Sequence, residues 1–230
     1  MTDQIVRWHV LPDGQALAGE VSREILDAAH AAIRSRGQFH IVLAGGETPR
    51  SVYAQLAAQS AVWSKWRIYF GDERCLPAND PGRNDTMAWE AWLARVTMAP
   101  ENVLAIPAEL GAEQGALRYG ATLRQLGDFD LVLLGLGEDG HTASLFPRRA
   151  LGDDVGAPDT LAVHDAPKPP AERVSLSAAR LARTRQVFFL VTGANKRAAV
   201  MAWQGGEALP ASRIRPLGGV DVFLDAAAMP

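Results

Sequence analysis

The sequence of 230 residues predicts an α/β fold with a mostly parallel sheet. Short apolar runs alternate with longer stretches whose apolar residues recur at helical spacing, which is the pattern of strands joined by crossover helices. The segment 129–136 is nearly all apolar, as a central parallel strand buried on both faces should be. A domain averages about 150 residues. Because the chain contains no linker or internal repeat, we expect a single domain over residues 1–230.

Strands are expected where short apolar runs are bounded by turn residues. The segment 129–136 is the clearest of them, and 187–191 is another run without a polar interruption. The complete set of expected strands is 5–10, 39–43, 67–70, 103–106, 129–136, 174–176, 187–191 and 220–224.

Helices are expected where apolar residues recur at three- and four-residue spacing. Such a pattern starts at Leu17 and ends near Gly37, because glycine is a common helix stop. After the Gly45–Gly46 turn, Thr48 suits the N-cap and Pro49 the first position of the next helix. Further helices are expected over 84–95, over 112–126 and after Gly193. The segments 71–83 and 152–170 are rich in polar and turn residues, so both are expected to be irregular.

Charge and composition exclude several classes of protein. The formal net charge of −3 is too small for a nonspecific binder of nucleic acid, and its sign does not suit a membrane surface. No apolar run approaches the roughly 18 residues that a membrane span needs. The one cysteine, Cys75, excludes an internal disulfide and a thiolate metal site, and it fits a reducing compartment. The first residues lack the charge and apolar core of a signal peptide. We therefore expect a cytoplasmic protein without nucleic-acid or membrane partners, and we expect it to be a monomer.

Ligands of open α/β sheets bind beyond the carboxyl ends of the strands, and four loops there carry chemically informative residues. In the first, Gly45 and Gly46 let the backbone approach a ligand and the following helix start offers free N–H groups, which suits a phosphate. A tight turn with a capped helix is the alternative interpretation. In the second, Asp72 and Arg74 follow a strand and could position a polar substrate and stabilise developing negative charge. The alternative is a surface ion pair.

The third loop contains His141, the strongest candidate for a catalytic residue. Its Gly-x-Gly-x-x-Gly spacing is not a dinucleotide motif, because Glu138 and Asp139 would face a pyrophosphate and Pro147 would interrupt the helix. A histidine in a glycine-rich loop at a strand end can act as a general base near neutral pH. Asp139 could orient its ring or bind substrate hydroxyls. A structural role is the usual alternative, and it is the interpretation for the remaining histidines, which are His9, His30, His40 and His164.

The fourth loop contains Lys196, one of only three lysines against twenty arginines. A lysine between a strand and a helix is a candidate for contacting a phosphate, although an exposed helix lysine is equally usual. Arg173 is a further candidate cation, and the sequence leaves the role of Arg50 open. One cysteine and no paired-histidine motif predict neither a metal nor another cofactor.

Together these motifs resemble the family of glucosamine-6-phosphate deaminases and 6-phosphogluconolactonases, over about residues 39–224. The carriers are Leu-Ala-Gly-Gly-Glu-Thr-Pro at 43–49, Gly-Asp-Glu-Arg at 71–74 with Asn84, the loop 135–147, Arg-Val-Ser-Leu-Ser at 173–177 and Val-Thr-Gly-Ala-Asn-Lys at 191–196. The resemblance implies a Rossmann-like three-layer α/β/α domain. It also implies hydrolysis of the ester bond in 6-phospho-D-glucono-1,5-lactone, in the pentose phosphate pathway, without metal or nucleotide.

Deaminases of this family carry Asn and then Glu shortly after the Asp-Gly-His motif, whereas this chain has Leu145 and Phe146 there. The resemblance therefore favours the lactonase branch, and a deaminase-type enzyme or a nonenzymatic sugar-phosphate sensor stays open. In the lactonase interpretation His141 activates water and Arg74 stabilises the oxyanion. Asp139 and Asp72 hold ring hydroxyls or orient the histidine. The residues implied to hold the phosphate are Gly45, Gly46, Thr48, Arg173 and Lys196.

Overall fold

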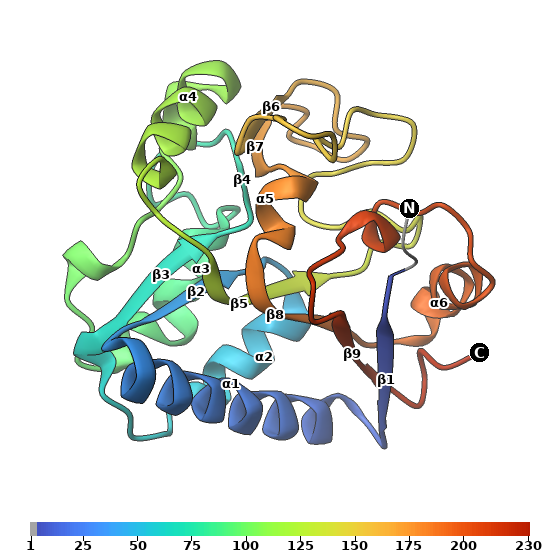
Figure 1. Ribbon diagram of the computed structural model, residues 1–230, viewed down its shortest axis with the longest axis horizontal. Helices are drawn as coiled ribbons and strands as arrows, with labels where there is room; N and C mark the ends of the chain where they lie inside the picture. Colours follow the sequence, from blue (N-terminus) through green and yellow to red (C-terminus); the bar gives the residue numbers. More distant parts are fainter. Residues whose placement is uncertain (1–3) are drawn as a thin grey trace.

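A six-stranded parallel sheet forms the centre of the computed structural model, which describes residues 4–230 (Figure 1). Its strand order is β1-β9-β8-β5-β2-β3, and every neighbouring pair is parallel. These strands are β1 (Val6–Leu11), β2 (Phe39–Leu43), β3 (Trp66–Phe70), β5 (Phe129–Gly135), β8 (Thr184–Val191) and β9 (Val220–Asp225). A second, antiparallel sheet has the order β4-β7-β6 and consists of β4 (Asp72–Arg74), β7 (Arg173–Leu176) and β6 (Thr160–Val163).

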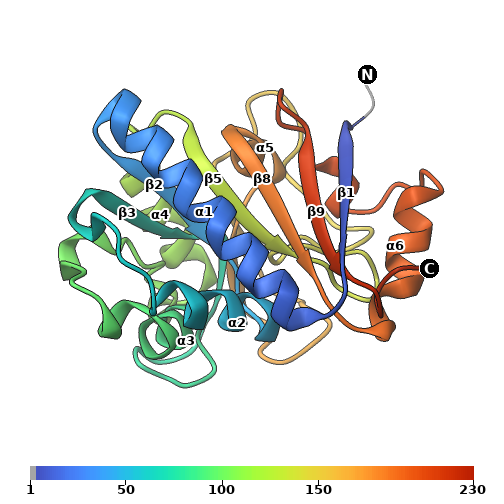
Figure 2. The same ribbon diagram turned by 90° about the horizontal axis from the view of Figure 1, so that it is seen from below.

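Helices cover both faces of the central sheet. Helices α1 (Gly14–Arg36) and α2 (Glu47–Leu56) cross one face, which Figure 2 shows from below. Helices α4 (Ala112–Leu123) and α5 (Ala178–Ala182) lie with the second sheet on the opposite side (Figure 1). This arrangement confirms the predicted α/β class with a mostly parallel sheet. The remaining helices are α3 (Asn84–Ala91), α6 (Arg197–Gln204) and the 3₁₀ turns η1 (Trp63–Lys65), η2 (Leu93–Arg95), η3 (Pro100–Asn102), η4 (Ala108–Leu110), η5 (Ala194–Lys196) and η6 (Ala211–Arg213).

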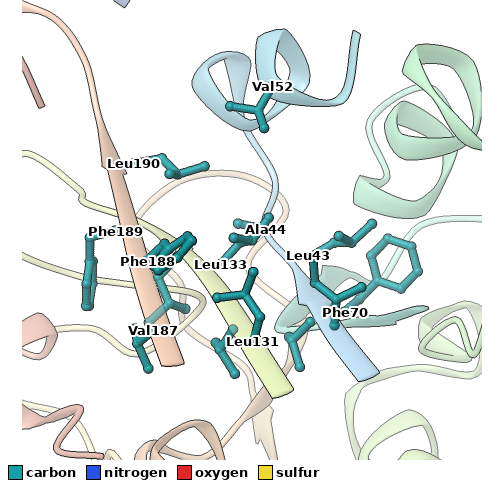
Figure 3. Packing of buried hydrophobic residues seen from close by; sticks show 14 of the residues in the cluster. Leu43, Ala44, Val52, Phe70, Leu131, Leu133, Val187, Phe188, Phe189 and Leu190 are labelled. Carbon is teal, nitrogen blue, oxygen red and sulfur yellow. The ribbon is translucent and has the colours of Figure 1, made fainter. Parts of the chain in front are cut away.

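The hydrophobic core lies on both faces of strand β5, as its sequence predicts. Residues 129–134 of this strand are all buried, and β5 pairs with β2 on one side and β8 on the other. Side chains of these strands, including Leu131 and Val187, belong to one buried cluster that also contains Val52 of α2 (Figure 3). Each fully buried aliphatic or aromatic side chain contributes about 1.5–3 kcal/mol. The polar loops at the strand ends therefore rest on a rigid base.

Several segments differ from the sequence-based expectations. Residues 103–106 form no strand, because Val103 makes only one bridge to edge strand β3 before Pro107 removes a backbone donor. The expected irregular segments 71–83 and 152–170 each contribute a strand, β4 and β6, to the second sheet. The helix expected over 84–95 breaks at Trp92, whose backbone leaves the helical region at φ −143° and ψ −60°.

None of the helices between residues 4 and 230 is long and apolar enough to span a membrane. Residues 1–3, on which the expectation about export partly rests, lie outside the described part of the chain.

Candidate active site

A cavity of about 780 Å³ opens beyond the carboxyl ends of the central strands. The loops after β2, β5 and β8 line it, together with strand β4, the start of α3, the segment that precedes β7 and the first residue of β7. This convergence follows from the parallel sheet, which places the carboxyl ends of its strands at one edge. The structure brings every predicted site residue to the lining: Gly45, Gly46, Thr48, Asp72, Arg74, Asp139, His141, Arg173 and Lys196. Their individual roles stay predictions.

His141 and Asp139 form a close pair on the loop after β5. The imidazole Nδ1 lies 2.5 Å from Oδ1 of Asp139, and the backbone N–H of His141 donates to the same oxygen at 3.2 Å. Burial raises the pKa of the Asp139 carboxyl, but the hydrogen bond and charge of His141 outweigh it, so this pKa lies below its ordinary value. When Nδ1 donates to the carboxylate, the lone pair of the neutral ring is on Nε2. Within residues 4–230, Nε2 has no hydrogen-bonding partner.

Two glycines make this loop geometry possible. A Cβ atom on Gly137 would overlap with the imidazole ring of His141, so only glycine leaves room for the ring. Gly140 has φ +81°, a left-handed conformation that glycine adopts without strain. The ring of Phe146 also packs against His141, with 4.9 Å between ring centroids. The imidazole is therefore packed against both Gly137 and Phe146.

Asp72 is held at the cavity wall by two donors. Its Oδ2 accepts from the Ser144 hydroxyl at 2.6 Å, and its Oδ1 accepts from Asn84 Nδ2 at 3.2 Å. Asn84 in turn packs so closely on Gly45 that a Cβ atom there would overlap with the amide. Asn84 thus connects the Asp72 strand to the glycine turn. Sequence reasoning noted Asn84 only as part of the resemblance and gave it no role.

Glu73, between Asp72 and Arg74, is fully buried and does not face the cavity. Its carboxylate accepts from the backbone N–H groups of Arg74 and Asn84 at 2.8 Å each and of Asp85 at 2.9 Å. Burial raises the pKa of Glu73 to about 7, against the lowering effect of the Asn84 N–H bond. This side chain therefore fixes the start of α3 relative to β4, and with it two cavity residues.

The two predicted site arginines lie opposite each other across the β4–β7 pair. Arg74 donates from Nη1 to the carbonyl of Gly82 at 2.5 Å. Arg173 donates from Nη2 to the carbonyl of Lys168 at 2.8 Å and from Nε to that of Pro170 at 3.2 Å. Much of the Arg173 guanidinium is therefore engaged by backbone. Arg50 does not line the cavity, and its guanidinium lies 3.8 Å from the Glu90 carboxylate instead.

The glycine turn leads directly into α2, as predicted. Gly46 has φ +106°, and no side chain caps the helix, so the first N–H groups of α2 stay available at the cavity. The Thr48 hydroxyl lies 2.7 Å from that of Thr192, on the loop after β8. The helix begins two residues earlier than predicted, because Gly46 takes the cap position. Thr48 is its second residue and not its N-cap, and Pro49 is its third residue and not its first.

Two lysines line the cavity, although sequence reasoning identified only Lys196. Burial and the charge of Lys168 together bring the pKa of Lys196 below its ordinary value, against the opposing charges of Glu138 and Asp139. Glu138 accepts a hydrogen bond from Asn195 at 2.8 Å. The sequence shows Lys168 only as one of three lysines, between Pro167 and Pro169, and this position does not by itself place it at the end of a strand.

Metal-ligating groups of residues 4–230 are not clustered. Over the described range 4–230, no three His, Cys, Asp or Glu side chains lie close enough together to hold a metal ion. Cys75 does not line the cavity, and burial raises the pKa of its thiol to about 11, which makes it a poor nucleophile. Metal-independent chemistry stays a prediction, which turnover in the presence of EDTA tests.

Comparison with known proteins confirms the family resemblance. The sequence model of the family described as glucosamine-6-phosphate isomerases/6-phosphogluconolactonase matches residues 12–223. A 6-phosphogluconolactonase of Nostoc sp. is 36% identical over 237 residues, which cover 95% of each chain. The crystal structure of a 6-phosphogluconolactonase from Thermotoga maritima superposes with a TM-score of 0.88 at 26% identity, covering 96% of this chain and 100% of that one. A monomeric glucosamine-6-phosphate deaminase has the same fold, with a TM-score of 0.83 at 20% identity over 96% of this chain and 98% of that one.

Proposed function

The chain belongs to the glucosamine-6-phosphate isomerase/6-phosphogluconolactonase family, and from this premise we propose that it hydrolyses 6-phospho-D-glucono-1,5-lactone to 6-phospho-D-gluconate. This reaction would make it an enzyme of the pentose phosphate pathway. The observation that carries the proposal is the His141–Asp139 pair, which leaves Nε2 beside the cavity without a partner among residues 4–230. Ester hydrolysis needs such a base, because water is a weak nucleophile at neutral pH.

His141 would act as the general base. Asp139 accepts the Nδ1 proton, and Nε2 would take a proton from a water molecule as its oxygen attacks the lactone carbonyl. A tetrahedral intermediate with a negatively charged oxygen results. The imidazolium that forms stays next to the Asp139 carboxylate, which stabilises its charge. When the bond from the carbonyl carbon to the ring oxygen breaks, His141 would return the proton to that oxygen.

Arg74 would stabilise the oxyanion. Its Nη1 is fixed by the Gly82 carbonyl, and its other guanidinium N–H groups meet no acceptor within residues 4–230. A planar, permanently charged donor in a partly enclosed cavity is suited to developing negative charge. Asp72, held by Ser144 and Asn84, would accept hydrogen bonds from substrate hydroxyls. In this arrangement Asp139 orients the histidine and Asp72 binds the sugar.

The 6-phosphate would bind between the glycine turn and Lys196. Gly45, Gly46 and the start of α2 would offer backbone N–H groups, and Thr48 would add a hydroxyl. Lys196 would supply positive charge, and Arg173 would add its charge to the same cavity. Binding energy from this remote group would fix the lactone relative to His141.

The deaminase alternative depends on an acid that this chain lacks. Where the deaminase motif has Glu, Phe146 stands, buried and packed against the His141 ring. The fold itself does not separate the two activities, since a deaminase has it as well. A sugar-phosphate sensor would bind its ligand in the same cavity without turning it over.

One set of assays separates these functions. The lactone is generated freshly and its disappearance is followed, with correction for spontaneous hydrolysis. An enzymatic rate above that background supports the proposal. Ammonia release from glucosamine 6-phosphate would instead support the deaminase, and binding of 6-phosphogluconate without either turnover would support the sensor.

A further inference from the structure

The loop that precedes β7 places a lysine at the cavity and is held there by Arg173. We define the Lys168 loop as residues 166–171. A backbone hydrogen bond from Ala166 N to Ala171 O, of 3.0 Å, closes it. Pro167, Pro169 and Pro170 restrict its backbone, because each proline ring fixes φ. The loop is thus a constrained support for a single charged side chain.

Arg173 is buried, and its guanidinium faces this loop. It donates to the carbonyls of Lys168 and Pro170, and the Phe146 ring lies 5.8 Å away on the cavity wall. Backbone carbonyls already accept from two of its nitrogen atoms, so fewer donors remain for a substrate. Its clearest interaction is with the loop and not with the open cavity.

Lys168 and Lys196 come from different parts of the chain and line the same cavity. In the described chain, neither ammonium group donates a hydrogen bond or forms an ion pair. The neighbouring carboxylate of Glu138 accepts a hydrogen bond from Asn195, and its negative charge attracts both ammonium groups. The single charge of Glu138 balances only one of the two ammonium charges, so a further anion in the cavity would be attracted to the pair. A phosphate monoester carries nearly two negative charges at neutral pH, which matches two ammonium groups.

We propose that Lys168 is a substrate-binding residue that holds the phosphate together with Lys196, and that Arg173 is a positioning residue that acts by fixing the Lys168 loop. The proposal rests on the proposed function, because it takes the ligand to be the phosphosugar lactone. It also distinguishes Arg173 from Arg74. Arg74 would meet the reacting carbonyl directly, whereas Arg173 would reach the phosphate only through Lys168.

The first test compares two substrates. Lys168→Ala should raise the KM for 6-phosphogluconolactone about tenfold, the loss expected for one charge-assisted hydrogen bond, and leave kcat within about twofold. Its kcat/KM for unphosphorylated glucono-1,5-lactone should not change. Lys65→Ala, at an exposed lysine that does not line the cavity, is the matched control and should change neither substrate. An equal effect of Lys168→Ala on both substrates, or none on either, would overturn the assignment.

The second test is a double-mutant cycle that separates positioning from direct contact. Arg173→Ala should raise the KM for the phosphorylated lactone severalfold in the wild-type background but less than twofold in the Lys168→Ala background. Arg173→Gln, which can still donate to one loop carbonyl, should restore part of the loss. Equal factors in both backgrounds would show that Arg173 contacts the phosphate itself. Thermal unfolding of each variant identifies any that fail to fold. Lys168 is exposed, so the KM of Lys168→Ala tests the role of this lysine even if the Arg173 variants do not fold.

A binding measurement keeps the two proposals distinguishable. Calorimetric titration with 6-phosphogluconate should give a Kd about tenfold weaker for Lys168→Ala than for the wild-type protein. If the wild-type protein does not turn over the lactone yet shows this difference, the proposed function fails and the phosphate-binding role stands. If turnover is present and the Kd is unchanged, the role of Lys168 fails alone.

Discussion

Replacing Asp139 by Asn should slow the chemical step without weakening substrate binding. The substitution removes the negative charge that lies against His141 Nδ1 at 2.5 Å. An amide that turns its NH₂ group toward Nδ1 would also favour the tautomer in which Nε2 carries the proton and cannot act as a base.

The size of the expected decrease in kcat depends on how exposed the His141–Asp139 pair is to water. The side chains of His141 and Asp139 are 25% and 43% exposed. Two unit charges about 4 Å apart interact by about 1 kcal/mol in water and by about 4 kcal/mol at an effective dielectric constant of 20. A half-exposed pair lies between these limits, so the imidazolium loses about 2 to 3 kcal/mol. This corresponds to a decrease in kcat of about 30- to 160-fold.

The assay is steady-state hydrolysis of 6-phosphogluconolactone, with kcat and KM determined separately. Asp221→Asn is the matched control, because Asp221 likewise partners a histidine, His9 at 2.8 Å, on strands away from the cavity. That control should keep the wild-type kcat. If Asp139→Asn retains kcat within threefold of wild type, Asp139 does not orient the catalytic base.

Three further changes test other parts of the site. Arg74→Lys should lower kcat at least tenfold despite the conserved charge, because an ammonium group cannot reproduce the planar donor geometry; full turnover would reduce Arg74 to diffuse positive charge. Glu73 has a pKa of about 7 in the folded protein and of about 4.5 in the unfolded chain. Between pH 4.5 and pH 7 the folded state therefore binds more protons than the unfolded state, and the stability of the wild-type protein should fall as the pH rises through this range. The loss in unfolding free energy from this titration is about 3 kcal/mol. It should be missing when the unfolding free energy of Glu73→Gln is measured by chemical denaturation at several pH values. If the wild-type protein and the variant show the same pH dependence, Glu73 does not titrate in this range. EDTA and added divalent metals should leave lactone turnover unchanged, and activity lost in EDTA and restored by one equivalent of metal would contradict metal-independent hydrolysis.

The parts of the fold that follow from local chemistry could be predicted from the sequence. Strand β5 is apolar along nearly its whole length, and such a sequence is typical of a strand that is covered on both faces. Strand β4 could not be predicted, because its residues are Asp, Glu and Arg. Its buried Glu73 is satisfied by N–H groups of Asn84 and Asp85, which are distant in the sequence. Polar composition therefore indicated a loop where tertiary hydrogen bonds build a strand.

The same distinction applies to the cavity. The His141–Asp139 pair spans two residues in one loop, so its contact could be anticipated from the sequence. Lys168 could not, because its segment is rich in proline and contains no regular structure. Its place at the cavity depends on the Arg173 hydrogen bonds to the loop carbonyls. Strand β7 of the second sheet places Arg173 beside the loop, and the pairing of β4, β7 and β6 into this sheet could not be predicted from the sequence.

The most direct measurement is the rate of 6-phosphogluconolactone hydrolysis by the wild-type protein and by His141→Asn, each corrected for spontaneous hydrolysis. The wild-type protein should exceed the background rate, and His141→Asn should lower kcat by about 10² to 10⁴, the usual contribution of a general base. Circular dichroism and thermal unfolding should show that the variant keeps its fold. A wild-type rate at the background level would contradict the lactonase function, and a variant within a few fold of wild type would contradict the role of His141.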